Sequence, residues 1–415
     1  SERPAVEVRP TRNLDAYQAY LQGKHLLRQP HFTLESWNRA LTSLERAVEI
    51  DPGFTAAWAE LTRAHSRLIY FKVDASPERL ALAGHALEKA VTGSPDSPEV
   101  HLAAGYYHLW AIRDAAGARE EFQIAAQQMP NSTEVLEGLG ESARLQGRID
   151  DAIDHYRRAT EISPLDASPG VELGLSQWWG RRFEESLQSS NRAIALAPDG
   201  TWPYITKTLN EWSWKGGTPR GRAALEAISS AHPWLPWLWF WQELYEGRYR
   251  EAAERLDASA GEWIKLKICI RPKPLLQSYA LELLEEPEHA RAATQQALAM
   301  LEAKVRENPD EPRYMSSLGI ALALLGRRDE AISAGRRAVD LFPLAKDAIY
   351  AQPHVQDLAH IYLLAGAFDS ACDQLGLLLS IPGWTATALL EPDPRWAPLR
   401  DQPCYLELVK PDAGL

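Results

Sequence analysis

A short pattern of small, large and proline residues recurs along the chain and constrains its fold more than any other feature. It reads Ala-x3-Leu-x2-Ala-x4-Pro, with an aromatic residue in place of leucine in some copies, and early copies begin at Ala40, Ala83, Ala118 and Ala152. At these spacings the small and large residues share one helix face, where they let a second helix approach and fill the gap to it. Because proline cannot continue a helix, each copy predicts a helix that packs closely and then stops.

The distance between the terminating prolines gives the length of the repeat. Pro52, Pro95, Pro130, Pro164, Pro198 and Pro233 follow one another at intervals of 43, 35, 34, 34 and 35 residues. A regular period of this length is typical of a helical-hairpin array, in which each hairpin buries its second face against its neighbour. The longer first interval predicts an extra loop, which we place at residues 70–76.

The stretch 133–164, TEVLEGLGESARLQGRIDDAIDHYRRATEISP, contains the pattern in its fullest form. Gly140, Ala159 and Pro164 recur 34 residues later in the next stretch. The period and the order of residues resemble the tetratricopeptide repeat (TPR), in which Leu-Gly-x2-Tyr and Ala-x3-Phe precede Ala and Pro. The resemblance covers nearly all of the chain. It implies an all-α helical-hairpin solenoid, a right-handed superhelix of about nine or ten repeats with a non-repeat C-terminal cap.

Breaks in the pattern suggest five segments. They are an extended lead-in (1–13), an N-terminal TPR array (14–256), a connection or hinge (257–273), a C-terminal TPR array (274–382) and a cap (383–415). Residues 265–273, KLKICIRPK, alternate apolar and basic side chains, which favours extended backbone over a helix. We therefore expect this segment to join the two arrays and to be a candidate hinge.

The two ends of the chain carry a second resemblance. The opening PTRNLDAYQAYLQGKHLL and the closing EPDPRWAPLRDQPCYLEL resemble the C-terminal TPR half of bacterial multidomain signalling proteins. In those proteins the repeats follow a nucleotidyl cyclase, a Ser/Thr kinase or a winged-helix DNA-binding domain. The first residue is Ser1 rather than Met, so we expect a piece of a longer protein, with the choice among the three domains open.

Composition narrows the classes of partner. With 56 acidic and 44 basic residues the formal net charge is −12, which repels a polyphosphate backbone and argues against nucleic acid. The sequence contains no run of 18 apolar residues, so it predicts no membrane-spanning helix. Cys269, Cys372 and Cys404 are too few and too scattered for a disulfide framework or a zinc cluster, so we expect a reducing, cytoplasmic location.

Tryptophan is concentrated in the middle of the chain, where ten of the fifteen lie between Trp178 and Trp263. In the TPR family, four positions of each first helix line the concave face. Carried over to this sequence, those positions are occupied by Trp178, Trp202, Trp212, Trp234, Trp237 and Trp241. Indole rings in a groove offer apolar contact and one N–H donor each, which would suit a bound peptide or another ligand. Alternatively, the rings only fill a widened stack of degenerate hairpins, and both interpretations remain open.

The same register places Glu99, Glu134, Glu137 and Glu141 on the concave face of the preceding repeats. An acidic groove would favour a basic or amine-bearing partner, whereas carboxylates near helix N-termini are also common as solvated groups. The TPR proteins that bind the acidic C-termini of chaperones need Lys and Asn where this chain has Glu137 and Glu141. We therefore exclude that ligand.

The remaining motifs do not indicate a cofactor site, a metal site or a catalytic site. Gly138-x-Gly140-x-x-Ala143 matches a short dinucleotide fingerprint, but no strand precedes it. His101 and His108 occupy packing positions of the repeat rather than a metal site. We expect no metal, no cofactor and no catalytic residues.

The sequence thus predicts a non-catalytic interaction and regulatory module that binds a peptide or protein partner in its concave groove. A small-molecule sensor with a tryptophan-lined central pocket is the alternative. An enzyme with its active site in the degenerate centre is a third, weaker hypothesis, because no residues are arranged for acid–base or nucleophilic work.

Overall fold

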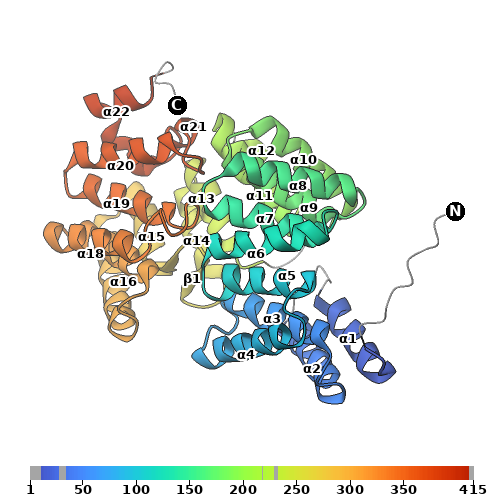
Figure 1. Ribbon diagram of the computed structural model, residues 1–415. Helices are drawn as coiled ribbons and strands as arrows, with labels where there is room; N and C mark the ends of the chain where they lie inside the picture. Colours follow the sequence, from blue (N-terminus) through green and yellow to red (C-terminus); the bar gives the residue numbers. More distant parts are fainter. Residues whose placement is uncertain (1–10, 28–33, 217, 229–231, 411–415) are drawn as a thin grey trace. The chain divides into compact units, whose positions relative to one another are not determined.

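The computed structural model describes residues 11–27, 34–216, 218–228 and 232–410 (Figure 1). The predicted lead-in falls largely outside these residues. The chain divides into two compact units, which we describe separately. Unit 1 contains residues 1–143 and 154–164, and unit 2 contains residues 144–153 and 165–415.

Unit 1 is built from the first helix pairs of the chain. Its elements are α1 (Leu14–Leu27), α2 (Leu34–Ile50), α3 (Thr55–Tyr70), α4 (Pro77–Gly93), α5 (Pro98–Tyr106), the π-helical turn η1 (Tyr107–Ala111), α6 (Ala115–Gln128), most of α7 (Thr133–Leu145) and the second half of α8 (Ile149–Ile162).

Unit 2 continues the helix pairs and adds a short hairpin and a terminal cap. Its elements are α9 (Ala167–Trp179), α10 (Phe183–Leu196), α11 (Thr201–Lys215), α12 (Thr218–Glu226), α13 (Leu235–Tyr245), α14 (Tyr249–Ala258), β1 (Trp263–Lys265), β2 (Ile270–Pro272), α15 (Lys273–Leu283), α16 (Pro287–Glu307), α17 (Pro312–Leu324), α18 (Arg328–Leu341), α19 (Gln352–Leu364), α20 (Phe368–Ser380), α21 (Thr387–Leu390), the 3-10 helix η2 (Pro394–Leu399) and α22 (Pro403–Leu408).

The all-α hairpin prediction is confirmed. In the described residues, ten consecutive helix pairs run from α1–α2 to α19–α20. The alanines of the recurring pattern are fully buried at its first and third positions, as Ala118 and Ala125 illustrate, and Phe122 between them is equally inaccessible. The predicted extra loop is also present, because α3 ends at Tyr70 and α4 begins at Pro77.

Glycine at the helix contacts allows the pairs to approach. A Cβ atom added to Gly140 would lie 2.8 Å from the ring of Tyr156, and one added to Gly105 would lie 2.4 Å from the ring of Phe122. Real Cβ atoms are not found at such distances, so any side chain there would push the two helices apart. The small residues of the pattern are therefore explained by close packing.

The segment expected to be extended forms an antiparallel hairpin, in which Trp263 pairs with Pro272 and Lys265 with Ile270. It is anchored to the helices that follow: Ser317 Oγ donates to the Ile270 carbonyl at 2.7 Å. Lys265 is exposed, whereas the residues of β2 are buried. The division into two arrays joined at residues 257–273 stays a prediction.

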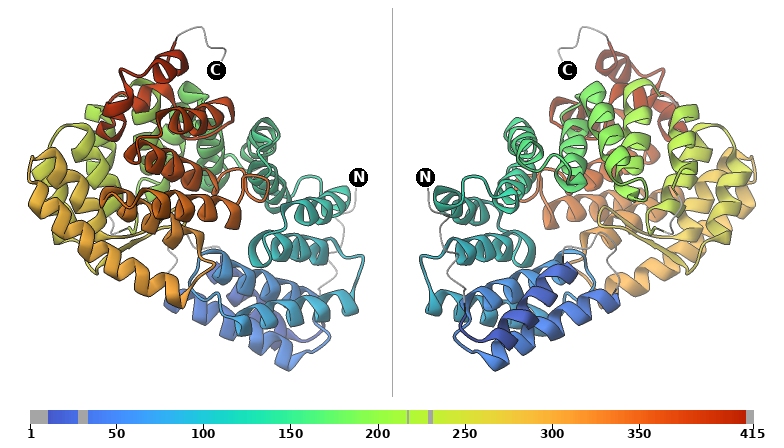
Figure 2. Two further views of the ribbon diagram at one scale, coloured as in Figure 1. Left: turned by 90° about the vertical axis from the view of Figure 1, so that its left-hand side faces the viewer. Right: turned by 90° about the vertical axis from the view of Figure 1, so that its right-hand side faces the viewer.

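The cap packs back onto the middle of unit 2. We call residues 381–400 the C-terminal segment; they include α21, which contacts α11 (Figure 2). Arg181 anchors this segment by donating to the backbone carbonyls of Leu379 at 2.7 Å and of Ile381 and Thr385 at 3.0 Å each. The C-terminal segment therefore packs against α9, α11 and α13 of the middle repeats.

A disulfide bond joins Cys372 of α20 to Cys404 of α22, whose Cα atoms lie 6.0 Å apart. The three cysteines were expected to remain reduced, which is wrong for this pair. The error has a simple cause, since 32 residues separate the two cysteines in sequence and only the folding back of the cap brings them together. Cys269 is free and buried.

Candidate functional site

The first helices of unit 1 carry a face of interacting charged and aromatic side chains, which we call the charged face. It comprises Lys24 of α1, Glu60, Arg63, Arg67 and Tyr70 of α3, Tyr106 of α5, Trp110 of η1, and Glu134, Glu137 and Glu141 of α7. Every member comes from the first helix of its pair or from the turn that continues it. This is the set of helices on which the sequence analysis places the concave face.

The three glutamates of α7 are half-buried rather than freely solvated. Glu134 lies 3.3 Å from Nη2 of Arg63, which also binds Glu60 at 3.0 Å. Glu141 accepts hydrogen bonds from Trp110 Nε1 at 3.1 Å and from the Tyr70 hydroxyl. The carboxylates of α7 therefore belong to a network with α3.

Two arginines offset the acidity of the charged face. Arg63 stacks over the ring of Tyr106, with its guanidinium carbon 5.0 Å from the ring centroid. Burial lowers the pKa of Arg67 to about 10, and repulsion from Arg63 acts in the same direction. Burial also raises the pKa of Tyr106, and the negative charge of Glu137 raises it further. The face is thus mixed in charge, which a sequence register that lists only its acidic members does not reveal.

Other residues considered from sequence have local partners. Glu99 is exposed and accepts from Ser97 Oγ at 2.5 Å. His101 pairs with Glu121 at 2.7 Å, and His108 with Asp114 at 3.0 Å. No group of three or more potential metal-binding side chains occurs in the described parts of the chain.

The six tryptophans predicted to line a groove divide into two sets. Trp178, Trp212, Trp237 and Trp241 line one pocket of unit 2, which we call the tryptophan pocket. Trp202 is 37% exposed. It contacts Trp234 instead, with their ring centroids 5.4 Å apart.

The tryptophan pocket is partly enclosed, and its lining includes half-buried as well as buried rings. Helices α9, α11 and α13 form one side with indole rings, while the β-hairpin contributes Arg271 and α19 contributes Asp357. The C-terminal segment supplies Trp384 and Arg395 as a further wall. The free volume is about 50 Å³. This is room for roughly four water molecules, since one water needs about 10–15 Å³.

Aromatic stacking fixes the C-terminal segment against the pocket. Trp384 stacks with Trp179 and Trp237 at centroid distances of 6.2 and 6.5 Å, with interplanar angles of 18° and 13°. Arg395 lies over Trp241, with its guanidinium carbon 4.1 Å from the ring centroid. Trp178, Trp212 and Trp241 are each 2% exposed. These three rings therefore pack the interior and border the pocket at once.

The polar groups of the pocket form two ion pairs. Arg271 binds Asp357 at 2.5 Å, and both side chains are only 6% exposed. Arg395 donates from Nε to Asp393 at 3.0 and 3.1 Å. Burial by itself lowers the pKa of Arg271, but the charge of Asp357, its hydrogen bond and the other nearby groups together raise that pKa above its ordinary value. The pairs keep both guanidinium groups charged inside the protein.

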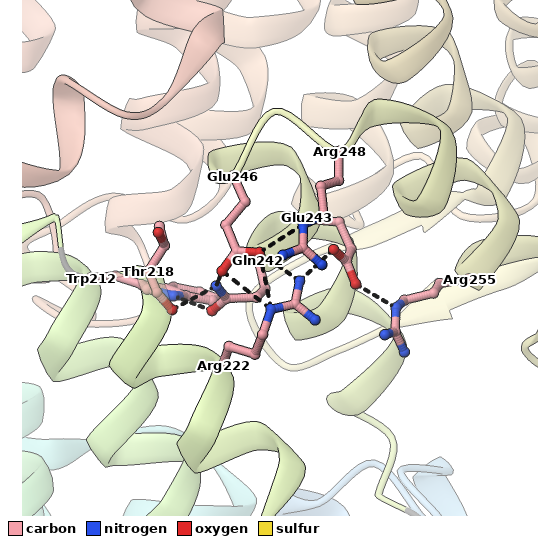
Figure 3. Close-up of polar contacts among 8 residues, drawn as sticks. All are labelled: Trp212, Thr218, Arg222, Gln242, Glu243, Glu246, Arg248 and Arg255. Atoms are coloured by element: carbon pink, nitrogen blue, oxygen red, sulfur yellow. Dashed lines mark hydrogen bonds and ion pairs between the residues drawn. The ribbon is translucent and has the colours of Figure 1, made fainter.

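A polar cluster behind the pocket holds Trp212 in place (Figure 3). Gln242 accepts from Trp212 Nε1 at 2.8 Å, and its amide donates to the Thr218 carbonyl at 2.8 Å. Arg222 reaches Glu243 and Glu246 at 2.5 and 2.6 Å. The cluster thus ties α11, α12 and α13 together and orients one wall of the pocket.

Sequence reasoning missed the residues that complete the pocket. Arg271 and Trp384 lie in segments without the repeat, and Asp357 lies in a repeat far along the chain. One feature of the sequence could have pointed to Arg271. The alternation of residues 265–273 places Arg271 on the same side of an extended segment as other basic residues.

Comparisons with known proteins agree with the fold. A family model described as "Tetratricopeptide repeat" matches residues 107–167 and 290–346. No curated protein matches the sequence. Within the described parts of the chain, no helix combines the length and apolar character that crossing a membrane requires.

Several solved structures have similar arrangements of helices. PilW, a widely conserved type IV pilus biogenesis factor, is 15% identical with a TM-score of 0.41, over 52% of this chain and 92% of its own. The human IFIT1 dimer with m7Gppp-AAAA is 16% identical with a TM-score of 0.47, over 79% of this chain and 72% of its own. A tetratricopeptide repeat protein from Parabacteroides merdae is 15% identical with a TM-score of 0.42, over 59% and 92%.

At these identities and TM-scores the likeness to the solved structures concerns the arrangement of helices and not what the chain binds. The matched repeats, the buried alanine pattern and the succession of helix pairs all concern the fold, and they agree with one another. The chain therefore has an all-α fold of tetratricopeptide-type helix pairs, with the family model matching two stretches of it.

Proposed function

We propose that the protein is a non-catalytic interaction and regulatory module that binds a peptide or protein partner on the charged face of unit 1. The composition of that face supports the proposal. Arginine, tyrosine and tryptophan are enriched where proteins bind one another. On the charged face Arg63, Arg67 and Trp110 are half-buried, whereas Tyr70 and Tyr106 are buried. TPR folds are suited to such a role because a row of first helices presents an extended surface.

The charge pattern of the face suggests what kind of partner fits. Glu137 and Glu141 are half-buried, and the negative charge of each raises the pKa of Arg67. A partner peptide with a basic residue would meet these glutamates, and its flanking acceptors would meet the arginines. Matched charge pairs of this kind set specificity and association rate.

A peptide-display selection tests this proposal. Peptides selected on the wild-type protein are titrated calorimetrically against a double variant, Glu137→Gln with Glu141→Gln. We expect at least a tenfold loss of affinity, because the carboxylates that pair with the peptide are gone. Glu78→Gln with Glu88→Gln on α4, a second helix of its pair, is the matched control. Failure to select any peptide, or selected peptides that bind both double variants equally, would contradict the proposal.

The wider setting is also part of the proposal. We infer that the module belongs to a bacterial signalling protein, on the resemblance of its two ends, and that it contacts no nucleic acid, on its net charge of −12. A cytoplasmic location is proposed on the small number of scattered cysteines. The Cys372–Cys404 bond is instead typical of oxidising compartments, so the thiol content of the purified protein decides this point.

Motion between the two predicted arrays is a further element of the proposed regulation. The β-hairpin is held to α17, where Arg313 Nη1 donates to the Leu266 carbonyl at 3.0 Å. Residues 260–262 before it are less buried, and Gly261 has a φ of 75°. We infer that bending, if it regulates binding, occurs at 260–262 while the hairpin moves with α17. Unchanged small-angle scattering on addition of a selected peptide would argue against it.

A small-molecule sensor is the second candidate function, and one observation favours it. The tryptophan pocket encloses a buried arginine whose Nε and Nη1 have no hydrogen-bond partner among the described residues. Buried donors without partners are uncommon in folded proteins and call for an explanation. A ligand that completes them is one such explanation.

A further inference from the structure

We propose that the tryptophan pocket binds a small uncharged molecule with carbonyl-type acceptors, which completes the unpartnered donors of Arg271, Trp241 and Trp384. This inference rests on the second candidate function, the small-molecule sensor, and names its class of ligand. Three observations lead to it: the excess of donors, the balance of charges and the size of the pocket.

The unpartnered polar atoms of the pocket are donors. Arg271 Nε and Nη1, Trp241 Nε1 and Trp384 Nε1 are buried and have no hydrogen-bond partner among the described residues. The one carboxylate that lines the pocket, Asp357, already accepts from Arg271 Nη2 through Oδ1. A buried donor without a partner costs about 1–3 kcal/mol. A ligand that brings acceptors would therefore satisfy these donors.

The charges of the pocket are already balanced, which decides against an anion. Arg271 is paired with Asp357, and Arg395 is paired with Asp393. A carboxylate ligand would add a negative charge to a buried site that already holds two aspartates. Burying an uncompensated charge is far more costly than burying a hydrogen-bonded neutral group. An amide or another carbonyl compound supplies the acceptor without that cost.

The dimensions of the pocket limit the ligand to a small molecule. The pocket has room for roughly four water molecules, which together fill about the space of one small amide such as benzamide and leave no room for a peptide segment. The walls next to the free space include the rings of Trp237 and Trp241, which favour a flat, partly apolar body. Trp384 lies on the C-terminal segment, which Arg181 anchors through its carbonyls. These hydrogen bonds hold the Trp384 wall in place, so the pocket is formed before a ligand binds.

Indole NMR spectra of the full chain test this proposal. Protein labelled with 15N at tryptophan is titrated with benzamide, with benzoate and with toluene, which share a ring but differ in acceptor and charge. The signals of the two pocket indoles are assigned with Trp241→Phe and Trp384→Phe. We expect benzamide to move both N–H signals downfield and to raise the melting temperature, whereas benzoate and toluene leave the two signals in place.

Variants separate a ligand site from a structural role. Trp384→Phe keeps an aromatic ring and removes one donor, so we expect about fivefold weaker binding of benzamide with an unchanged circular dichroism spectrum. Arg271→Lys keeps the charge opposite Asp357 and removes the guanidinium donors, so we expect at least a tenfold loss. Trp58→Phe, whose indole donates to the Pro52 carbonyl in unit 1, is the matched control and binds like the wild type.

The contrary outcomes are distinct. Stronger shifts with benzoate than with benzamide would overturn the ligand class while leaving a sensor pocket in place. No shift of the Trp241 and Trp384 signals with any of the three probes would overturn both the ligand class and the sensor function. Equal benzamide binding by wild type and both pocket variants would place the site elsewhere and overturn the proposal.

Discussion

Single residues of this protein act over long distances in sequence. Arg181, in the turn between α9 and α10, donates to four backbone carbonyls of residues 378–385, the farthest of them 204 positions away. Hydrogen bonds from a charged donor are stronger than those between neutral groups. Arg181 therefore contributes strongly to holding the C-terminal segment against the tryptophans.

Replacing Arg181 by lysine should loosen that segment. Lysine keeps the charge but cannot reach four carbonyls from a planar fork, so we expect a loss of about 2 kcal/mol or more in the free energy of unfolding. Urea unfolding followed by tryptophan fluorescence measures it. Arg182→Lys is the matched control, because Arg182 is 37% exposed and pairs with Asp150, and exposed pairs contribute about 0–1 kcal/mol. Equal losses in both variants would contradict the anchoring role.

Buried histidine makes the stability of unit 2 depend on pH. His354 lies on α19, where its Nδ1 is 2.8 Å from Ser316 Oγ, and burial lowers its pKa to about 4. In the unfolded chain the imidazole takes up a proton below its ordinary pKa of about 6.5. Between these values the unfolded state binds more protons, so the free energy of unfolding falls as the pH is lowered from 6.5 to 4.

We expect this histidine to account for about 3 kcal/mol of that pH dependence, since one pKa unit corresponds to about 1.4 kcal/mol. His354→Gln should flatten the curve of unfolding free energy against pH over this window, whatever its effect at neutral pH. His289→Gln, at a side chain that is 76% exposed, should leave the slope unchanged. Denaturant titrations at pH 7, 5.5 and 4 provide the measurement. An unaltered slope in His354→Gln would rule out this origin.

At the scale of elements, a disulfide fastens the last helix to the repeat before it. The bond between Cys372 and Cys404 closes a loop of 32 residues, and α22 packs on α20. Trp396 and Leu399, in the loop between the two cysteines, are fully buried in the same apolar cluster. The cap is thus fixed by packing as well as by the bond.

A thiol titration and a variant that lacks the bond test the disulfide. Thiol titration of the denatured, non-reduced protein should find one free thiol per chain, that of Cys269, and three after reduction. Cys404→Ser should lower the free energy of unfolding by about 3–4 kcal/mol, the loop-closure contribution for this length. Cys269→Ala controls for the loss of a thiol without a bond. Three thiols before reduction would show that the protein does not carry this disulfide.

At the scale of the molecule, each compact unit has its own buried core. In unit 1 the core includes Leu44, Phe54 and Leu61, and in unit 2 it includes Leu375 and Trp396. In a repeat array most contacts are between neighbours, so stability is close to a sum over repeats and their interfaces. A run of complete hairpins should therefore fold without the rest of the chain.

A fragment of residues 1–164, ending where the fourth pair is complete, should be helical and unfold cooperatively by circular dichroism. A fragment of residues 1–145 keeps α7 but lacks α8, so Gly140 loses the ring of Tyr156 that packs against it. We expect a clearly lower melting temperature for the shorter fragment. A broad, non-cooperative transition in both fragments would show that unit 1 does not fold independently.

Much of the fold could be predicted because its determinants are local. Alanine and glycine at fixed spacings, with a proline at the end, set where helices pack and stop, and these positions are buried in the structure as expected. The candidate sites were harder to predict. Of the six tryptophans that the register places on one face, Trp178, Trp212, Trp237 and Trp241 line one pocket. The register could not tell rings that pack the interior from rings that line a site, because the same face does both.

The sequence by itself determined the succession of helical hairpins, since a pattern of about three dozen residues encodes each pair and its neighbour. Only the tertiary structure decided that the C-terminal segment lies over the tryptophans, that Cys372 meets Cys404, and that Arg271 faces the indoles beside Asp357. The physical reason is the range of the interactions. Helix pairing repeats with a short period and leaves a signature in the chain, whereas one contact between segments 200 residues apart occurs once and leaves none.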